Sequence, residues 1–130
     1  MLECLILGDS IAVGTQYFRP NCGVYAKSGI NSAQWNINYR MMELNADTVV
    51  ISLGSNDAGI DTEKELTKLR SRVKAKKVYW IVPAIKPKIQ HIVEQIAYKN
   101  KDRIVKIPSL SRDGVHPTYR GYQKIGDITK

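Results

Sequence analysis

Short apolar runs alternate along the chain with segments whose apolar residues recur at helical spacing. Five runs are rich in valine and isoleucine and have the length of β-strands: residues 2–7, 24–26, 48–53, 78–82 and 103–107. The runs at 2–7, 48–53 and 78–82 are almost continuously apolar. This is typical of parallel strands that are covered on both faces.

The segments between these runs predict helices. The clearest apolar stripe, at i, i+3, i+4 and i+7, consists of Ile89, Ile92, Val93 and Ile96. Weaker stripes are Trp35, Tyr39 and Met42; Leu66, Leu69 and Val73; and Tyr122, Ile125 and Ile128. Thr62 and Glu65 have capping-box spacing just before the stripe that begins at Leu66, so we expect a helix to begin there.

Strand and helix alternate about five times, which predicts a three-layer α/β domain with a mostly parallel sheet. A chain of 130 residues has the size of one domain, so we expect residues 1–130 to form a single unit. In open sheets of this kind, sites form at the carboxyl ends of the strands.

Polar clusters follow four of the predicted strands. They are Gly8-Asp9-Ser10, Ser28-Gly29, Gly54-Ser55-Asn56-Asp57 and, after the fifth strand, Asp113-Gly114-Val115-His116-Pro117. Because parallel strands end at one edge of their sheet, we expect these clusters to converge there.

These clusters contain the groups that acyl transfer by a serine requires. A serine hydroxyl needs a base, usually histidine, and the histidine needs a partner that fixes its tautomer. Preorganised donors must stabilise the oxyanion of the tetrahedral intermediate. Ser10, His116 and Asp113 can fill the first three roles, and Gly29 with Asn56 can supply donors.

In these four blocks and their order, the chain resembles the SGNH, or GDSL-like, hydrolase family over almost its whole length. The resemblance implies that Ser10 is the nucleophile, His116 the base and Asp113 the residue that orients it. It also implies an oxyanion hole made by the N–H groups of Ser10 and Gly29 and the side-chain amide of Asn56.

The resemblance further implies a flavodoxin-like fold with a five-stranded parallel sheet in the order 2-1-3-4-5. It implies hydrolysis of esters or thioesters without a metal or another cofactor. Family members are usually longer, with insertions that shape the acyl and alcohol pockets. This chain is therefore either a minimal version with an open, shallow site or a scaffold that has lost catalysis.

Several polar and aromatic residues favour structural roles. Asp9 is expected to cap a helix or hold the turn before Ser10, and Asp57 to anchor its loop. His91 lies within a predicted helix and is expected to have no catalytic role. Trp35 and Tyr39 are expected to pack in the core. No metal site is expected, because no second ligand falls at suitable spacing near His116.

The net charge of +8 arises mainly from basic residues crowded into 64–77 and 99–106. Such charge can attract nucleic acid, acidic glycans or anionic surfaces, but here it alternates with acids, which favours a solvated face. Without a recognisable nucleic-acid motif, we do not expect a nucleic-acid partner, while an acidic glycan remains open.

The sequence predicts neither a membrane-spanning segment nor export. No apolar run approaches the ~20 residues needed to span a bilayer. The N-terminus lacks a basic region and its apolar run is broken by Glu3, so no signal peptide is expected. We therefore expect a cytoplasmic protein, with a virion protein as an alternative. In a reducing compartment, Cys4 and Cys22 would be free thiols.

The leading functional hypothesis is a serine esterase that acts on a small acyl ester, with carbohydrate O-acetyl groups favoured. The short chain leaves few residues for a long acyl groove, the candidate site residues are polar and the surface is basic. A thioesterase or lysophospholipase is the first alternative. A non-catalytic binding or structural module is the second, against which the intact constellation argues. A nucleotide- or phosphate-binding domain is disfavoured because no glycine-rich phosphate motif is present.

Overall fold

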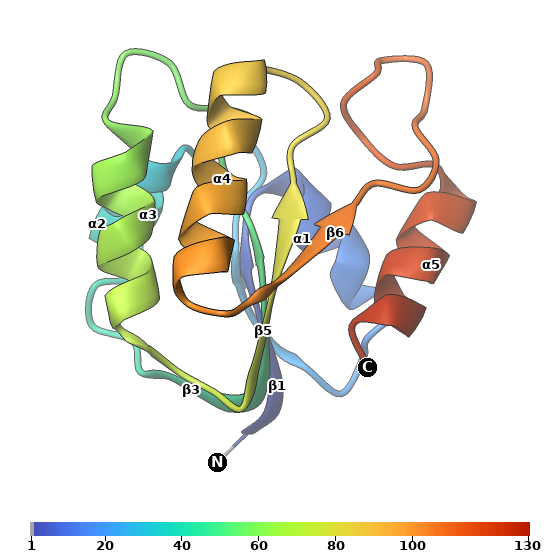
Figure 1. The fold of residues 1–130 in the computed structure, drawn as a ribbon. Helices are drawn as coiled ribbons and strands as arrows, with labels where there is room; N and C mark the ends of the chain where they lie inside the picture. The colour runs from blue at the N-terminus through green and yellow to red at the C-terminus, as the bar shows by residue number, and fades with distance from the viewer. Residues whose placement is uncertain (1) are drawn as a thin grey trace.

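A parallel sheet of six strands forms the middle layer of the computed structural model, which describes residues 2–130 (Figure 1). The strands are β1 (Leu2–Gly8), β2 (Gly23–Ala26), β3 (Leu44–Ser52), β4 (Val73–Lys74), β5 (Lys77–Val82) and β6 (Arg103–Lys106). Their spatial order is β2-β1-β3-β5-β6, and the short β4 pairs with the beginning of β3.

Five helices among the described residues complete the sandwich: α1 (Ser10–Gln16), α2 (Ser32–Asn38), α3 (Thr62–Ser71), α4 (Pro87–Lys99) and α5 (Tyr119–Ile128). Helices α2, α3 and α4 cover one face of the sheet, and α1 and α5 cover the other (Figure 1). Trp35 and Trp80 are fully buried on the first side, and Ile11 and Ile125 on the second. The predicted packing role of Trp35 is thereby confirmed.

The predicted three-layer fold and strand order are confirmed, since the fourth and fifth predicted strands are β5 and β6. Two assignments differ from the structure by more than one residue. β3 begins at Leu44 rather than at 48, and Val73, expected on a helix, lies in β4 opposite Leu44. Val73 has helical spacing from Leu69, but α3 ends at Ser71 and a two-residue strand has no period that a sequence could reveal.

The helix boundaries also depart in detail from the predicted stripes. Helix α2 ends before Tyr39, so Met42 belongs to no helix and is partly exposed. Helix α3 is capped by Asp61, whose side chain accepts from the Lys64 N–H, and not by a Thr62–Glu65 capping box. The Thr62 hydroxyl instead donates to the Asp57 carboxylate.

The prediction of two free thiols was wrong, because Cys4 and Cys22 form a disulfide. Leu5 pairs with Gly23 in the parallel register of β1 and β2, so the residues just before them are also cross-strand neighbours. Their Cα atoms lie 4.7 Å apart, within the range that a disulfide requires. This register has no sequence signal, because β2 is short and only half-buried.

Reduction of this disulfide is expected to destabilise the fold by about 3 kcal/mol, the loop-closure contribution of a bridge across a loop of roughly this size. The bridged residues are 18 apart in sequence. Urea unfolding of the wild type with and without dithiothreitol measures the change. The urea midpoint of the Cys22→Ser variant should be the same with and without dithiothreitol. Identical wild-type midpoints in both conditions would show that the bridge contributes nothing.

Within residues 2–130, the helices are all too short or too polar to cross a membrane.

Candidate active site

Ser10 lies at a sharp turn between β1 and α1, at the carboxyl edge of the sheet. The turn depends on Gly8, whose φ is +143° and at which a Cβ atom would collide with the Ser52 carbonyl oxygen of β3. Only glycine allows so close an approach in this conformation. As the first residue of α1, Ser10 has a backbone N–H that no intrahelical bond uses.

Asp9 caps α1 and is buried, which confirms its predicted structural role. Its Oδ1 accepts hydrogen bonds from the Ile11 N–H at 3.0 Å and the Ser52 hydroxyl at 3.1 Å. Burial nevertheless raises the pKa of Asp9 from 3.8 to about 6. Because this pKa exceeds that of the unfolded chain, Asp9 favours folding most below about pH 4 and progressively less as the pH rises through about 6.

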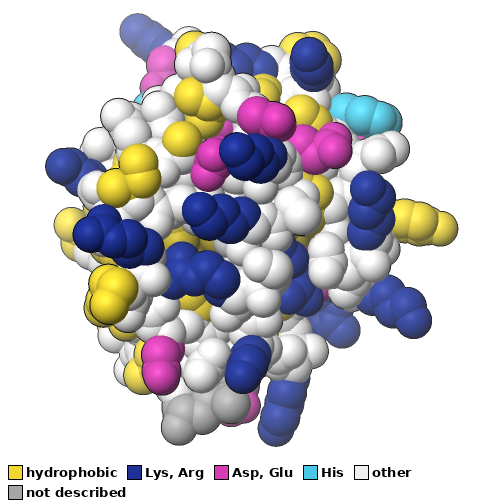
Figure 2. Space-filling view, turned by 90° about the vertical axis from the view of Figure 1, so that its left-hand side faces the viewer, with side chains coloured by type: hydrophobic (Ala, Val, Ile, Leu, Met, Phe, Trp, Pro, Cys, Tyr) yellow, Lys and Arg dark blue, Asp and Glu magenta, His cyan; other side chains and the backbone are white. Residues whose placement is uncertain are grey.

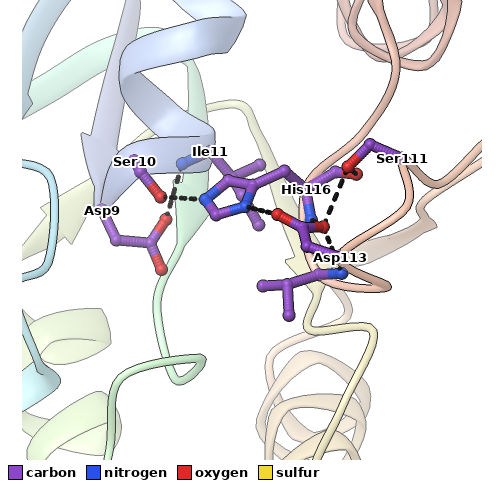
Figure 3. Close-up of polar contacts among 7 residues, drawn as sticks. Asp9, Ser10, Ile11, Ser111, Asp113 and His116 are labelled. Atoms are coloured by element: carbon purple, nitrogen blue, oxygen red, sulfur yellow. Dashed lines mark hydrogen bonds and ion pairs between the residues drawn. The ribbon is translucent and has the colours of Figure 1, made fainter.

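Ser10, His116 and Asp113 form a continuous hydrogen-bonded chain, although the serine and the histidine are 106 positions apart in sequence (Figure 3). Ser10 Oγ lies 2.8 Å from His116 Nε2, and His116 Nδ1 lies 2.6 Å from Asp113 Oδ2. A carboxylate can only accept here, so the network assigns the proton to Nδ1 and leaves Nε2 free to accept from the serine hydroxyl.

Asp113 is held as a carboxylate by the loop that carries it. The backbone N–H groups of His116 and Val115 donate to its Oδ1 at 2.9 and 2.8 Å. These bonds, with smaller contributions from the His116 ring and the Ser111 hydroxyl, hold the pKa of Asp113 well below its usual range. Asp113 therefore stays charged at every pH at which enzymes are normally assayed.

Ser111 is a further member of this loop that the sequence reasoning did not single out. Its hydroxyl lies 2.8 Å from Asp113 Oδ1 and 2.9 Å from the His116 carbonyl oxygen. Its N–H also donates to that carbonyl oxygen at 2.8 Å. Ser111 thus ties together the two ends of the segment between Asp113 and His116. No spacing rule would have marked it, because its role depends on the closed shape of the loop.

The loops that carry Gly29 and Asn56 are joined by a hydrogen bond. Gly29 occupies a tight turn closed by the Ile30 N–H and the Lys27 carbonyl oxygen, with φ +82°. Asn56 Nδ2 donates to the Ile30 carbonyl oxygen at 3.1 Å, which connects the two loops. The Gly29 N–H has no acceptor among the described residues, and the second Asn56 amide hydrogen is likewise unused there.

Asp57 anchors the loop that presents Asn56, as predicted. Its buried carboxylate accepts from the Ser32 N–H at 2.9 Å, the Ser32 hydroxyl at 2.8 Å and the Thr62 hydroxyl at 2.7 Å. One side chain thereby connects the starts of α2 and α3 to the loop after β3. His91, by contrast, lies on α4, and no hydrogen bond joins it to Ser10, His116 or Asp113 among the described residues.

Two hollows border these loops. One of about 290 Å³ has polar walls that include Lys27, Ser28, Gly29 and Asn38. The other, of about 270 Å³, has mixed walls, with apolar side chains that include Val82, Ile107 and Leu110 and polar ones from Gln90, Glu94 and Lys106. A larger hollow of about 620 Å³ lies between α4 and β6 and contains none of the predicted site residues.

Basic side chains spread over the face formed by α2 and α3, with acidic side chains among them (Figure 2).

No three His, Cys, Asp or Glu side chains within residues 2–130 are grouped so as to bind a metal ion.

No protein-family model matches the sequence, and no curated protein matches it. Several solved structures, by contrast, are similar to this chain. A GDSL-like lipase from Bacteroides thetaiotaomicron has a TM-score of 0.69 at 22% identity, over 96% of this chain and 84% of the lipase. The catalytic domain of peptidoglycan O-acetyltransferase A from Streptococcus pneumoniae has a TM-score of 0.60 at 18% identity, over 95% of this chain and 88% of that domain.

An acetyl xylan esterase from the rumen bacterium Butyrivibrio proteoclasticus has a TM-score of 0.57 at 11% identity. The alignment covers 96% of this chain and 62% of that esterase. These similarities show that the chain has the fold of the GDSL-like, or SGNH, hydrolases, as the four sequence blocks predicted.

Proposed function

We propose that this chain is a serine esterase that hydrolyses a small acyl ester, with O-acetylated carbohydrate as the favoured substrate. The observation that carries the proposal is the hydrogen-bonded chain from Ser10 through His116 to Asp113. A serine, a neutral imidazole and a carboxylate in this order are the groups that make a serine nucleophilic.

The proposed reaction begins when Ser10 Oγ attacks the acyl carbon and its proton passes to His116 Nε2. Asp113 stabilises the imidazolium that results. The tetrahedral intermediate collapses, the alcohol leaves with the proton from Nε2, and the acyl group stays on Ser10. Water, activated by the same imidazole, then releases the acid and restores the serine.

Three donors would stabilise the oxyanion: the N–H groups of Ser10 and Gly29 and the Asn56 side-chain amide. Two observations support this assignment. The two N–H groups have no acceptor in the described structure, and Asn56 keeps one amide hydrogen free. Preorganised donors of this kind cost no reorganisation during reaction.

The small-substrate proposal rests on how open the site is. The side chains of His116 and Asp113 are 41% and 49% exposed. The longest connection after a strand, residues 107–118, is the one that carries Asp113 and His116 themselves. No other long loop remains among the described residues to enclose a fatty acyl chain.

A sugar is favoured as the alcohol because the hollow beside Gly29 is polar and includes the exposed Lys27. A lysine there would also suit an acidic glycan. Two structural neighbours are named for acetyl chemistry on glycans, a peptidoglycan O-acetyltransferase and an acetyl xylan esterase. The names of these two neighbours support a carbohydrate ester as substrate by analogy of fold.

A thioesterase or lysophospholipase is the second candidate, favoured by the hollow whose walls include Val82, Ile107 and Leu110. Leu110 is 44% exposed and lies in the same loop as His116. An acyl chain that reached this hollow would bury apolar surface on both sides.

Acyl-chain preference is expected to separate these two candidates. In an open site each added methylene meets water and gains little of the ~0.8 kcal/mol that burial provides. We therefore expect kcat/KM for p-nitrophenyl esters to be flat or to fall from acetate to octanoate. Release of acetate from acetylated sugars should accompany turnover of the acetate ester.

A rise of about tenfold or more across the series corresponds to ~1.4 kcal/mol of apolar contact and would favour the thioesterase or lysophospholipase. No turnover of any ester by the folded protein would favour a non-catalytic module instead.

A further inference from the structure

Lys86 has a backbone conformation that a lysine rarely adopts. It lies just before α4 as its N-cap residue, with φ +63° and ψ +80°. This left-handed region is unfavourable for a residue with a Cβ atom, and strained residues of this kind are found at sites where the surrounding structure imposes them. The Lys86 side chain makes no capping bond to α4, so capping does not explain the strain.

The Lys86 ammonium instead crosses to the loop that carries Asn56. Nζ donates to the Ser55 carbonyl oxygen at 3.0 Å and to the Asp57 carbonyl oxygen at 2.8 Å. These two carbonyls lie on either side of Asn56 in the chain. A single charged donor therefore holds both neighbours of the residue that is proposed to donate to the oxyanion.

The start of α4 packs closely against the Asn56 loop, which fixes the position of Lys86 relative to that loop. At Gly54 a Cβ atom would lie 2.7 Å from Ile89 Cγ2 and 3.2 Å from Pro83 Cγ. The loop after β3 thus lies directly against the first turn of α4. Pro87 at the first helical position further restricts the backbone next to Lys86.

The contacts of the Asn56 loop come from different directions. The Asp57 carboxylate ties the loop to α2 and α3, and Asn56 Nδ2 is tied to Ile30. Lys86 supplies the connection to α4, and it does so through backbone carbonyls rather than through a side chain.

We propose that Lys86 is a positioning residue that fixes the Asn56 amide for oxyanion stabilisation through its two bonds to the flanking carbonyls. The inference rests on the proposed function. Small displacements of a catalytic group can cost up to about 10²-fold in rate, so the precise placement of this loop affects catalysis.

A double-mutant cycle tests this role. Asn56→Ala should lower kcat by about 10² to 10³ with little change in KM, because the lost bond forms mainly in the transition state. Lys86→Met keeps the length and apolar stem of lysine but removes the donors, and should lower kcat by about tenfold with KM unchanged. In the Asn56→Ala background, Lys86→Met should have no further effect on kcat.

Lys86→Gly separates positioning from general stabilisation. Glycine adopts φ +63° readily, so this variant should melt no lower than Lys86→Met while losing kcat to the same extent. Lys86→Arg, which keeps a charged donor, should recover part of the rate. Lys88→Met removes an exposed lysine from the same helix turn and should match the wild type in both kcat and melting temperature.

The outcomes separate the two proposals. Unchanged kcat in Lys86→Met, or losses that multiply with those of Asn56→Ala, would overturn the positioning role while leaving the esterase intact. An Asn56→Ala variant with wild-type kcat would overturn the proposed oxyanion hole and the role of Lys86 with it. A wild type without esterase turnover would overturn both proposals.

Discussion

Replacement of Ser10 by alanine is expected to lower kcat by a factor on the order of 10⁴ or more, because no other group can take over the attack on the acyl carbon. The fold should be unaffected. Among the described residues, Ser10 has one side-chain hydrogen bond, to the partly exposed His116, and helix capping is performed by Asp9. Steady-state hydrolysis of p-nitrophenyl acetate measures the loss, and thermal unfolding checks the fold.

Covalent labelling gives an independent measure of the same role. A fluorophosphonate probe should modify the wild type once, at Ser10, and should not modify Ser10→Ala. Ser71→Ala, at an exposed position at the end of α3, should keep both labelling and activity. Labelling at another residue, or an alanine variant as active as the wild type, would reject Ser10 as the nucleophile.

The parallel sheet and the position of Ser10 at its carboxyl edge could be predicted because they depend on strong local signals, whereas the strand order was implied only by the resemblance to GDSL-like hydrolases. The apolar runs that form β1, β3 and β5 are buried on both faces, and a continuously apolar run is the pattern that such burial produces. Once parallel strands are assigned, the segments after them must meet at one edge of the sheet. Residues as distant in sequence as Ser10 and His116 could therefore be placed together from the strand pattern alone.

The features that were missed depend on tertiary contacts without a local pattern. The disulfide depends on the register between β1 and the half-buried edge strand β2. Strand β4 consists of only two residues, which pair with the start of β3. Lys86 reaches its acceptors across 29 and 31 positions in sequence. A lysine before a proline predicts no such contact, because the geometry arises only when α4 packs against Gly54.

Asp9 shows where sequence reasoning assigns a role but not its energetics. The residue caps α1 as predicted, yet its Oδ2 is buried without a partner in the described structure. Desolvation then outweighs the capping bonds and raises the pKa to about 6. The pKa of Asp113 shifts in the opposite direction, because this residue is exposed and accepts two backbone N–H bonds.

Replacement of Asp113 by asparagine is expected to lower kcat by about 10⁴ while leaving KM nearly unchanged. Asparagine keeps one oxygen that can accept from the Val115 and His116 N–H groups, so the loop should retain its shape. Its amide nitrogen would then face His116 Nδ1, where a donor requires Nδ1 to be unprotonated. The ring proton moves to Nε2, which can no longer accept the proton of Ser10.

The pH profile of the wild type should show no contribution from Asp113 titration. Because the pKa of Asp113 is lowered on folding, its stabilising effect is complete above the ordinary pKa of an aspartate and is lost only below it.

The matched control for Asp113→Asn is Asp127→Asn, which removes an exposed carboxylate of α5 paired with Lys130 and should keep wild-type kcat. If Asp113→Asn retains kcat within about tenfold of the wild type, Ser10 and His116 act as a dyad, and the carboxylate serves only to shape the loop.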